Sequence, residues 1–126
     1  MKIELDTISD QNIKINGYTS NSITINGHTY SENLIITQDS IYTENLPSEF
    51  SDLAIQTITQ IISANPEILI IGTGKTQQFL PDSLVSVIQQ AEIGLETMDT
   101  FAACRCFNLL CSEGRLVSAL LFQEVK

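Results

Sequence analysis

The spacing of hydrophobic residues changes near residue 50, and before that point it is typical of short β-strands. Residues 13–19 (IKINGYT) and 23–29 (ITINGHT) repeat one another ten residues apart. In each repeat isoleucine alternates with a polar residue, which places both isoleucines on one face of a strand. Each repeat then runs into Asn-Gly, the dipeptide that tolerates the positive φ angles of tight hairpin turns. We therefore predict an N-terminal antiparallel meander with a turn at each Asn-Gly, followed by a strand at residues 33–37 whose candidate partner is residues 40–43.

After residue 50 the spacing becomes helical. Residues 46–50 (LPSEF) interrupt the pattern, and Ser51 or Asp52 is placed to accept hydrogen bonds from the free N–H groups at a helix start. Asn65-Pro66 ends this helix, because proline disfavours a helical conformation in the residue before it. The apolar stripe of the predicted helix consists of Ala54, Ile55, Ile58, Ile61 and Ile62.

The rest of the chain alternates strands and helices. Residues 68–71 are apolar at every position, as expected for a central strand covered on both faces. A Gly-Thr-Gly turn then leads to a helix that begins at residues 81–83 (PDS) and ends before Gly94, with Leu84, Val85, Ile88 and Ala91 on its inner face. A strand at residues 95–98, a helix at residues 101–112 capped by Asp99 or Thr100, and a strand at residues 116–122 complete the prediction.

This order of elements predicts an α/β fold. The helix between the strands at 68–71 and 95–98 has the length of a crossover that joins parallel strands. Together with the antiparallel meander it predicts a sandwich built on a mixed sheet with flanking helices. We expect residues 1–126 to form a single domain, with a β-rich part at residues 1–45 and a helix plus βαβαβ core at residues 51–126.

Composition restricts the class of partner. Fifteen acidic residues against six basic ones give a net charge of −9. This balance argues against nucleic acid, which binds to clustered Lys and Arg, and permits docking on a basic protein. No stretch approaches the ~18 uninterrupted apolar residues of a membrane span, and the N-terminal MKIELDTISD has neither the apolar core of a secretory signal nor the arginines of a transit peptide. We expect a cytoplasmic, bacterial-type protein without membrane insertion.

The turn at residues 72–76 (GTGKT) is the first candidate for chemistry, since glycines after a strand let backbone N–H groups approach a phosphate. The spacing does not match either nucleotide motif. A phosphate loop requires glycine where Leu69 stands, and a dinucleotide fingerprint requires glycine where Gln77 stands. We predict no nucleotide cofactor, and two interpretations of the turn stay open: a plain turn, or a turn that faces a small anion.

The three cysteines, Cys104, Cys106 and Cys111, form a C-x-C-x4-C pattern. A structural zinc site requires four ligands, and the fourth would have to be His28 in a distant hairpin. We predict no metal and a packing role for these side chains. Cys104 stays of interest because a thiol near a helix N-terminus can have a lowered pKa.

The ends of the predicted parallel strands are the place to expect a pocket, because ligands bind outside the carboxyl ends of strands in α/β sheets. The polar Asn108 lies among apolar residues of the last helix, and if buried it needs hydrogen-bond partners that this corner or the glycine turn could provide. The predicted ligand- or partner-binding residues are therefore Gly72, Thr73, Gly74, Asp99, Thr100, Cys104 and Asn108.

The same residues carry a resemblance to a known family. The runs ILIIGTGKTQQFLP and IGLETMDTFAACRCFNLLCSEGRLVSALL, with INGYTSNSITINGHTY before them, resemble the small α/β domain family that includes mitochondrial NADH dehydrogenase (complex I) assembly factor 3. The resemblance implies a three-layer fold and a role in protein contacts. Two departures are visible: Cys106-Phe107 stands where the family usually has Thr-Tyr, and the chain has no tryptophan. The missing tyrosine hydroxyl weakens any catalytic role at that position.

Three functional interpretations follow. The favoured one is a non-enzymatic protein-binding or assembly-factor-like domain, with a protein partner and no cofactor. The alternative is a small-molecule binder or an undiscovered enzyme whose pocket lies where the glycine turn meets Asp99 and Thr100. The third is a structural homodimer. The sequence does not reveal a reaction.

Overall fold

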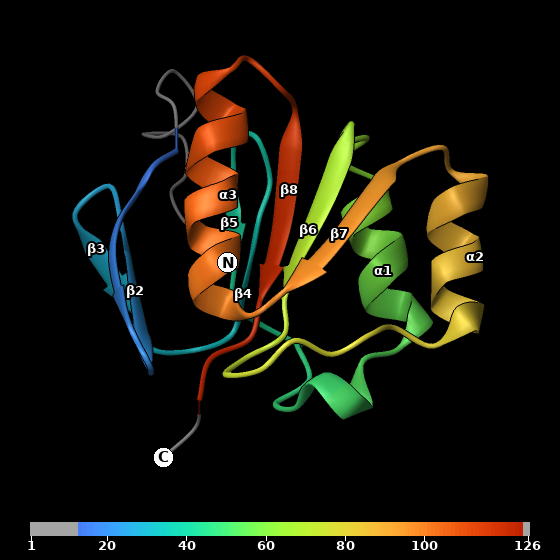
Figure 1. Ribbon diagram of the computed structural model, residues 1–126, viewed down its shortest axis with the longest axis horizontal. Coiled ribbons are helices and arrows are strands. Elements are labelled where there is room, and N and C mark those ends of the chain that lie inside the picture. The colour runs from blue at the N-terminus through green and yellow to red at the C-terminus, as the bar shows by residue number, and fades with distance from the viewer. Residues whose placement is uncertain (1–12, 125–126) are drawn as a thin grey trace.

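The structure, a computed structural model, describes residues 13–124, which form two β-sheets and three α-helices (Figure 1). The smaller sheet is an antiparallel meander of β1 (Ile15–Thr19), β2 (Ser22–Ile25) and β3 (His28–Tyr30). The larger sheet has the order β5-β4-β8-β6-β7 and consists of β4 (Leu34–Ile36), β5 (Ile41–Tyr42), β6 (Ile68–Gly72), β7 (Gly94–Met98) and β8 (Val117–Leu121). The helices are α1 (Ile55–Ile62), α2 (Asp82–Gln90) and α3 (Thr100–Ser112).

The five-stranded sheet is mixed, as predicted. β6 pairs in parallel with both β7 and β8, and β4 pairs antiparallel with β8 and with β5. The connection from β6 through α2 to β7 is therefore the βαβ crossover expected from the sequence. β8, although it comes last along the described chain, lies in the middle of the sheet between β4 and β6.

The sheet separates two apolar cores, which gives the predicted three layers. One core joins the sheet to α3 and the meander, and it contains Ile70, Phe107 and Ala119. The other joins the sheet to α1 and α2, and it contains Leu69 and Leu120. Successive residues of β6 and β8 thus point into opposite cores, which is why both strands are apolar along nearly their whole length.

The meander confirms the predicted isoleucine face and one of its two predicted turns. Ile15, Ile23 and Ile25 are all buried against α3. Asn26-Gly27 forms the turn between β2 and β3, with φ angles of 48° and 91°. The other Asn-Gly prediction is wrong, because Asn16-Gly17 lies inside β1, where the register shifts after Ile15. There Asn16 Oδ1 accepts a hydrogen bond from Gly27 N at 3.2 Å, so the first Asn-Gly supports the turn made by the second.

Two predicted helix ends also differ from the structure. Ser51 and Asp52 do not cap α1: they lie in a 3₁₀ turn (Phe50–Asp52), and α1 begins after Ala54 without a side-chain cap. Ala54 and Ile55 are therefore exposed at the helix start, and the buried stripe is formed by Thr57, Ile58 and Ile61. Tertiary packing of the later residues determines where this helix starts.

The end of α2 differs as well. Gly94 is the first residue of β7, and Ala91, which was predicted on the inner face, lies past the helix end and is exposed. The left-handed residue after the helix is Glu92, with φ 61°.

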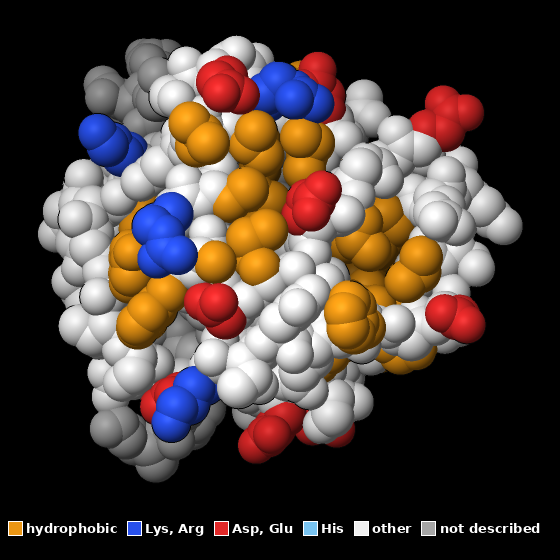
Figure 2. Space-filling model, viewed as in Figure 1, with side chains coloured by type: hydrophobic (Ala, Val, Ile, Leu, Met, Phe, Trp, Pro, Cys, Tyr) orange, Lys and Arg blue, Asp and Glu red, His pale blue; other side chains and the backbone are white. Residues whose placement is uncertain are grey.

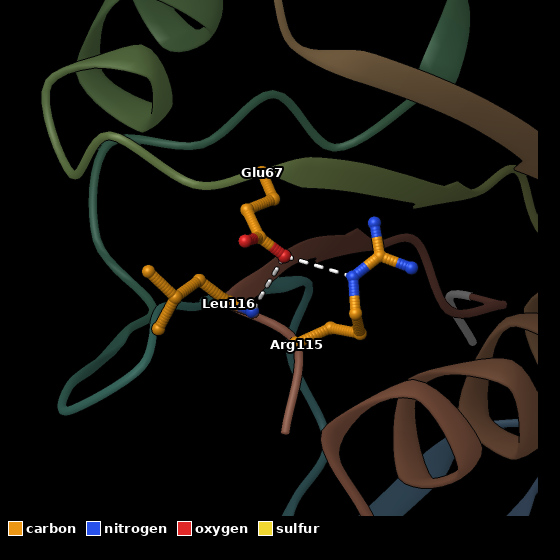
Figure 3. Close-up of polar contacts among 3 residues, drawn as sticks. All are labelled: Glu67, Arg115 and Leu116. Carbon is orange, nitrogen blue, oxygen red and sulfur yellow. Dashed lines mark hydrogen bonds and ion pairs between the residues drawn. The ribbon is translucent and has the colours of Figure 1, made fainter. Parts of the chain in front are cut away.

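At the amino ends of β6 and β8 an exposed ion pair joins the two strands (Figure 3). Glu67 Oε1 accepts hydrogen bonds from Arg115 Nε at 2.8 Å and from Leu116 N at 3.3 Å. These bonds lower the pKa of Glu67 below its ordinary value of 4.5, and the bond from Arg115 has the larger effect. The contact fixes the strands at the end opposite the predicted site.

Candidate functional site

The carboxyl ends of β6, β7 and β8 meet in one corner, and five of the seven predicted site residues lie there. Thr73 N donates to Met98 O at 2.8 Å, and Thr100 N donates to Gly74 O at 2.9 Å. The glycine turn and the residues after β7 are thus in direct contact, as expected from parallel strands. Whether they form a functional site stays a prediction.

Thr100 connects all three strand ends. It is 6% exposed, and its hydroxyl donates to Phe122 O at 2.6 Å while accepting from Gly74 N at 2.8 Å. A buried hydroxyl placed between one donor and one acceptor satisfies both. The side chain therefore holds the turn after β6 and the residue after β8 against the start of α3.

The close approach of α3 explains why β6 ends in a glycine, Gly72. A Cβ atom built on Gly72 would lie 2.9 Å from Thr100 Oγ1, closer than real Cβ contacts come, and 3.0 Å from Ala103 Cβ, tighter than nearly all of them. α3 therefore approaches the strand backbone at this point because no side chain intervenes. Gly74 has a φ of 101°, a left-handed conformation that favours glycine. These roles are structural and require no bound phosphate.

Thr73 folds the loop that leads to α2. Its hydroxyl donates to Thr76 O at 2.6 Å and accepts from Gln78 N at 3.1 Å. The next side chain, Gln77, donates through Nε2 to Thr97 O at 3.1 Å, which fastens the loop to β7. The Thr73 side chain is 3% exposed, so it acts from inside the corner.

Of the two predicted caps of α3, the structure uses Asp99, whose Oδ1 accepts from Ala102 N at 2.9 Å. Cys104 lies one turn further on and is fully buried. Burial raises the pKa of its thiol to about 12, so the predicted lowering by the helix N-terminus is wrong. Within residues 13–124 no group of three or more His, Cys, Asp or Glu side chains is placed to hold a metal ion.

Asn108 lies outside the corner, and the predicted partners for it were wrong. Its Oδ1 accepts from Ile15 N at 2.9 Å, and its Nδ2 donates to Ile15 O at 2.8 Å. The side-chain amide thus pairs with the edge of β1 as a neighbouring strand would. Asn108 attaches the meander to α3, a contact between residues far apart in sequence that no local signal indicates.

A pocket of about 160 Å³ opens on the solvent side of the corner. Its lining includes the aromatic side chains of Phe101 and Phe122 and the charged residues Lys75 and Asp99. The sequence prediction missed most of this lining, namely Thr19, Ser20, Lys75, Phe101, Phe122, Gln123 and Glu124. Phe101, an aromatic residue 40% exposed next to a helix cap, is one whose position in the sequence could have suggested it. Lys75 directly follows Gly74 in the sequence, so it too could have been included, whereas the other five residues reach the corner only through the tertiary fold.

Sequence comparison relates this chain to known proteins. A profile of the family described as "Protein of unknown function (DUF498/DUF598)" matches residues 15–122. The rat protein NADH dehydrogenase (ubiquinone) 1 alpha subcomplex assembly factor 3 is 30% identical over 113 residues, which are 88% of this chain and 60% of the rat protein. The chain thus spans less than two thirds of that relative's length.

Structural comparison gives the same fold. A crystal structure of a Bordetella parapertussis protein matches with a TM-score of 0.84 at 27% identity, covering 90% of this chain and 97% of that one. A Bordetella pertussis protein described as a Mth938-like domain matches with a TM-score of 0.77 at 24% identity, covering 97% and 92% of the two chains, and supports the fold alone.

Proposed function

We propose that this chain, which belongs to the DUF498/DUF598 family, is a non-enzymatic protein-binding domain that acts as an assembly factor does, through contacts with a protein partner. The similarity to assembly factor 3 supports a protein partner, although only part of that relative is matched. The partner of this chain need not be a respiratory complex. The proposal requires a surface that binds protein, and it is argued from the residues that remain exposed.

The observation that carries the proposal is how the polar groups of the predicted site residues are used. The hydroxyls of Thr73 and Thr100 and the amide of Asn108 bond to backbone groups of the same chain, and Asp99 caps α3. A general base or nucleophile must be able to reach a substrate proton or carbon. Groups that hold the fold together in this way favour a scaffold over a reaction centre.

The outer face of α3 supplies the surface. Leu109 is 58% exposed and Phe101 is 40% exposed, and Figure 2 shows hydrophobic side chains gathered along α3. Large apolar side chains exposed together on one face are typical of protein interaction sites. The accessible part of the corner, Gly74 with Asp99, adjoins this face and is proposed as its margin.

Crosslinked capture from native extract tests the proposal. The wild type is compared with Leu109→Asp on α3 and with Phe79→Asp, which changes an apolar side chain 77% exposed in the loop before α2. We expect one protein to be captured by the wild type and by Phe79→Asp, and lost with Leu109→Asp. The purified pair should then form a complex of defined mass in solution. Equal capture by all three chains, or none above an empty matrix, would contradict the proposal.

The pocket favours a second function, the binding of a small molecule. Two aromatic side chains together with Lys75 and Asp99 give the pocket an apolar surface with one charge of each sign, as small-molecule sites commonly have. Mass spectrometry of the chain purified from its own cells, under native conditions, should then show a bound compound that is absent from Phe101→Ala. A compound-free wild type would exclude this function.

Place of action and self-association belong to the same proposal. No helix within the described part of the chain is long and apolar enough to cross a bilayer. We place the domain in the cytoplasm, where fractionation should recover it. The third interpretation from the sequence is a structural homodimer. Light scattering of the purified chain measures its mass in solution and tests this directly.

A further inference from the structure

β7 is an edge strand of the large sheet, and one of its sides carries unused hydrogen-bonding groups. Gly94 N donates to Glu67 O, and Met98 O accepts from Thr73 N, so the backbone groups of residues 94, 96 and 98 face β6. Because these directions alternate along a parallel strand, the N–H and C=O of Leu95 and Thr97 point away from the sheet.

A single side chain covers part of that side. Gln77 Nε2 donates to Thr97 O at 3.1 Å from an exposed position. Among residues 13–124 no group bonds to the Leu95 N–H, the Leu95 C=O or the Thr97 N–H. Such a row of free donors and acceptors is a template for one more strand.

Apolar side chains flank the edge on both faces of the sheet. On the α3 face Met98, Cys106 and Leu110 are half-buried, and on the α2 face Val85 and Leu95 are half-buried. Figure 2 shows two gatherings of hydrophobic side chains, one along α3 and one over β7 and α2. An added strand would cover part of both.

Charge distinguishes the two sides of α3. Glu96 is exposed in the middle of β7 and lies near Cys106, where its carboxylate adds to the effect of burial in raising the pKa of that thiol. The bases of α3 and the segment after it are engaged elsewhere: Arg105 bonds to the Tyr18 hydroxyl at 3.2 Å, and Arg115 pairs with Glu67. The β7 side of α3 therefore presents a carboxylate to whatever pairs with the strand.

We infer that β7 binds an extended basic segment of a protein partner as an additional strand, with Lys or Arg side chains beside Glu96 on the α3 face and apolar side chains against Leu95 and Val85 on the α2 face. This inference rests on the proposed protein-binding function and names its contact. A second copy of the chain fits less well. The symmetric register that pairs Leu95 with Thr97 of the other copy places the two Glu96 carboxylates opposite each other, and like charges there are destabilising.

Synthetic peptides provide the probe. One is a blocked heptapeptide in which lysine alternates with valine, and the other has glutamate in place of lysine. With ¹⁵N-labelled full chain at low salt, we expect the lysine peptide to shift the Leu95 and Thr97 amide signals and to slow their hydrogen exchange. The glutamate peptide should leave both amides unchanged.

Two variants and one matched control sharpen the test. Thr97→Pro removes an outward N–H that the sheet does not use, so it should block peptide binding while the chain stays folded. Glu96→Lys should weaken binding of the lysine peptide about three- to tenfold, since a favourable cross-strand charge pair becomes an unfavourable one. Glu49→Lys makes the same charge change at an exposed position away from β7 and should leave binding unaltered.

The outcomes separate this inference from the proposed function. Peptide-induced changes confined to the pocket, no binding of either peptide, or a wild-type dimer that Thr97→Pro dissociates would each overturn the β7 inference. If the native partner is captured equally well by the wild type, Glu96→Lys and Thr97→Pro, the domain binds protein through another surface. If the peptide binds at β7 but no partner exists, the strand site stands and the proposed function fails.

Discussion

The two ends of the parallel strands are joined by different chemistry. At the carboxyl end, the buried Thr100 hydroxyl holds the turn after β6 and the residue after β8 through uncharged hydrogen bonds. At the amino end, the exposed carboxylate of Glu67 holds Arg115 and the backbone before β8 (Figure 3). Both arrangements join strands that are distant in sequence, yet only the first is shielded from water.

This difference indicates which end can support recognition. Removing one member of a buried network costs much stability, because its partners then lack hydrogen bonds. An exposed ion pair is screened by salt and contributes little to stability. The carboxyl end is therefore the rigid end, and it fixes the positions of the pocket, the start of α3 and the end of β7. Four changes test this contrast, from the largest expected effect to the smallest.

Gly72→Val should have the largest effect. The new side chain would overlap Thr100 and Ala103, so α3 must move away from β6. We expect the free energy of unfolding to fall by about 3 kcal/mol in urea titrations, as overpacking a close contact does. Gly94→Val, at the amino end of β7, is the matched control, since a Cβ atom on Gly94 would have its nearest neighbour, Glu67 O, at 3.6 Å. Similar losses at the two glycines would remove the distinction between the ends.

Thr100→Val should have the next largest effect. Valine keeps the shape of threonine but leaves Gly74 N and Phe122 O without their partner. We expect a loss of about 2 kcal/mol in the same titration. Thr100→Ser retains the hydroxyl and should lose less. A valine variant as stable as the wild type would show that the hydroxyl is not what joins the strand ends.

The buried thiol beside the corner predicts an alkaline dependence. The pKa of Cys104 is raised from 9.0 to about 12, so its contribution to stability is complete below pH 9.0 and declines as the pH rises toward 12. As the pH rises across that range, the free energy of unfolding should fall more steeply for the wild type than for Cys104→Ala. Parallel curves for the two proteins would contradict burial of a protonated thiol.

Glu67→Gln should have the smallest effect, and only at the acid side. Because the pKa of Glu67 is lowered in the folded chain, its contribution is present above the ordinary value of 4.5 and is lost as the pH falls through the folded value. The stability difference between wild type and variant should shrink in acid and in high salt. A difference that persists in strong salt would mean that the pair is not screened as an exposed contact must be.

How far the sequence predicts this fold depends on whether the signal is local. The strictly apolar run before Gly72, the alternation in β1 and β2, and the cap at Asp99 each follow from the spacing of residues close in sequence. The two Asn-Gly dipeptides show the limit. They are identical locally, but only Asn26-Gly27 turns the chain, because Asn16-Gly17 lies within β1, where the pairing skips Asn16 and its side chain supports that turn.

The candidate site likewise contains features that the local sequence predicts and features that it does not. The corner follows from the rule that parallel strands end together, so the proximity of Gly74 to Thr100 could be predicted. The attachment of Asn108 to Ile15 joins residues 93 apart, and the pocket wall supplied by Phe122 depends on where β8 inserts. The pKa of Cys104 was predicted in the wrong direction because the helix N-terminus was considered without the burial that outweighs it.

The central position of β8 has a consequence for synthesis of the chain. The ribosome releases β4 and β6 long before it releases Val117–Leu121, yet both strands take β8 as their neighbour. Throughout that interval the nascent chain carries two apolar strand edges that only the later segment can occupy. A polypeptide stopped just before Val117 would lack the middle strand of its sheet rather than an edge strand. Chaperones that bind apolar extended segments could then bind at the exposed edges of both β4 and β6.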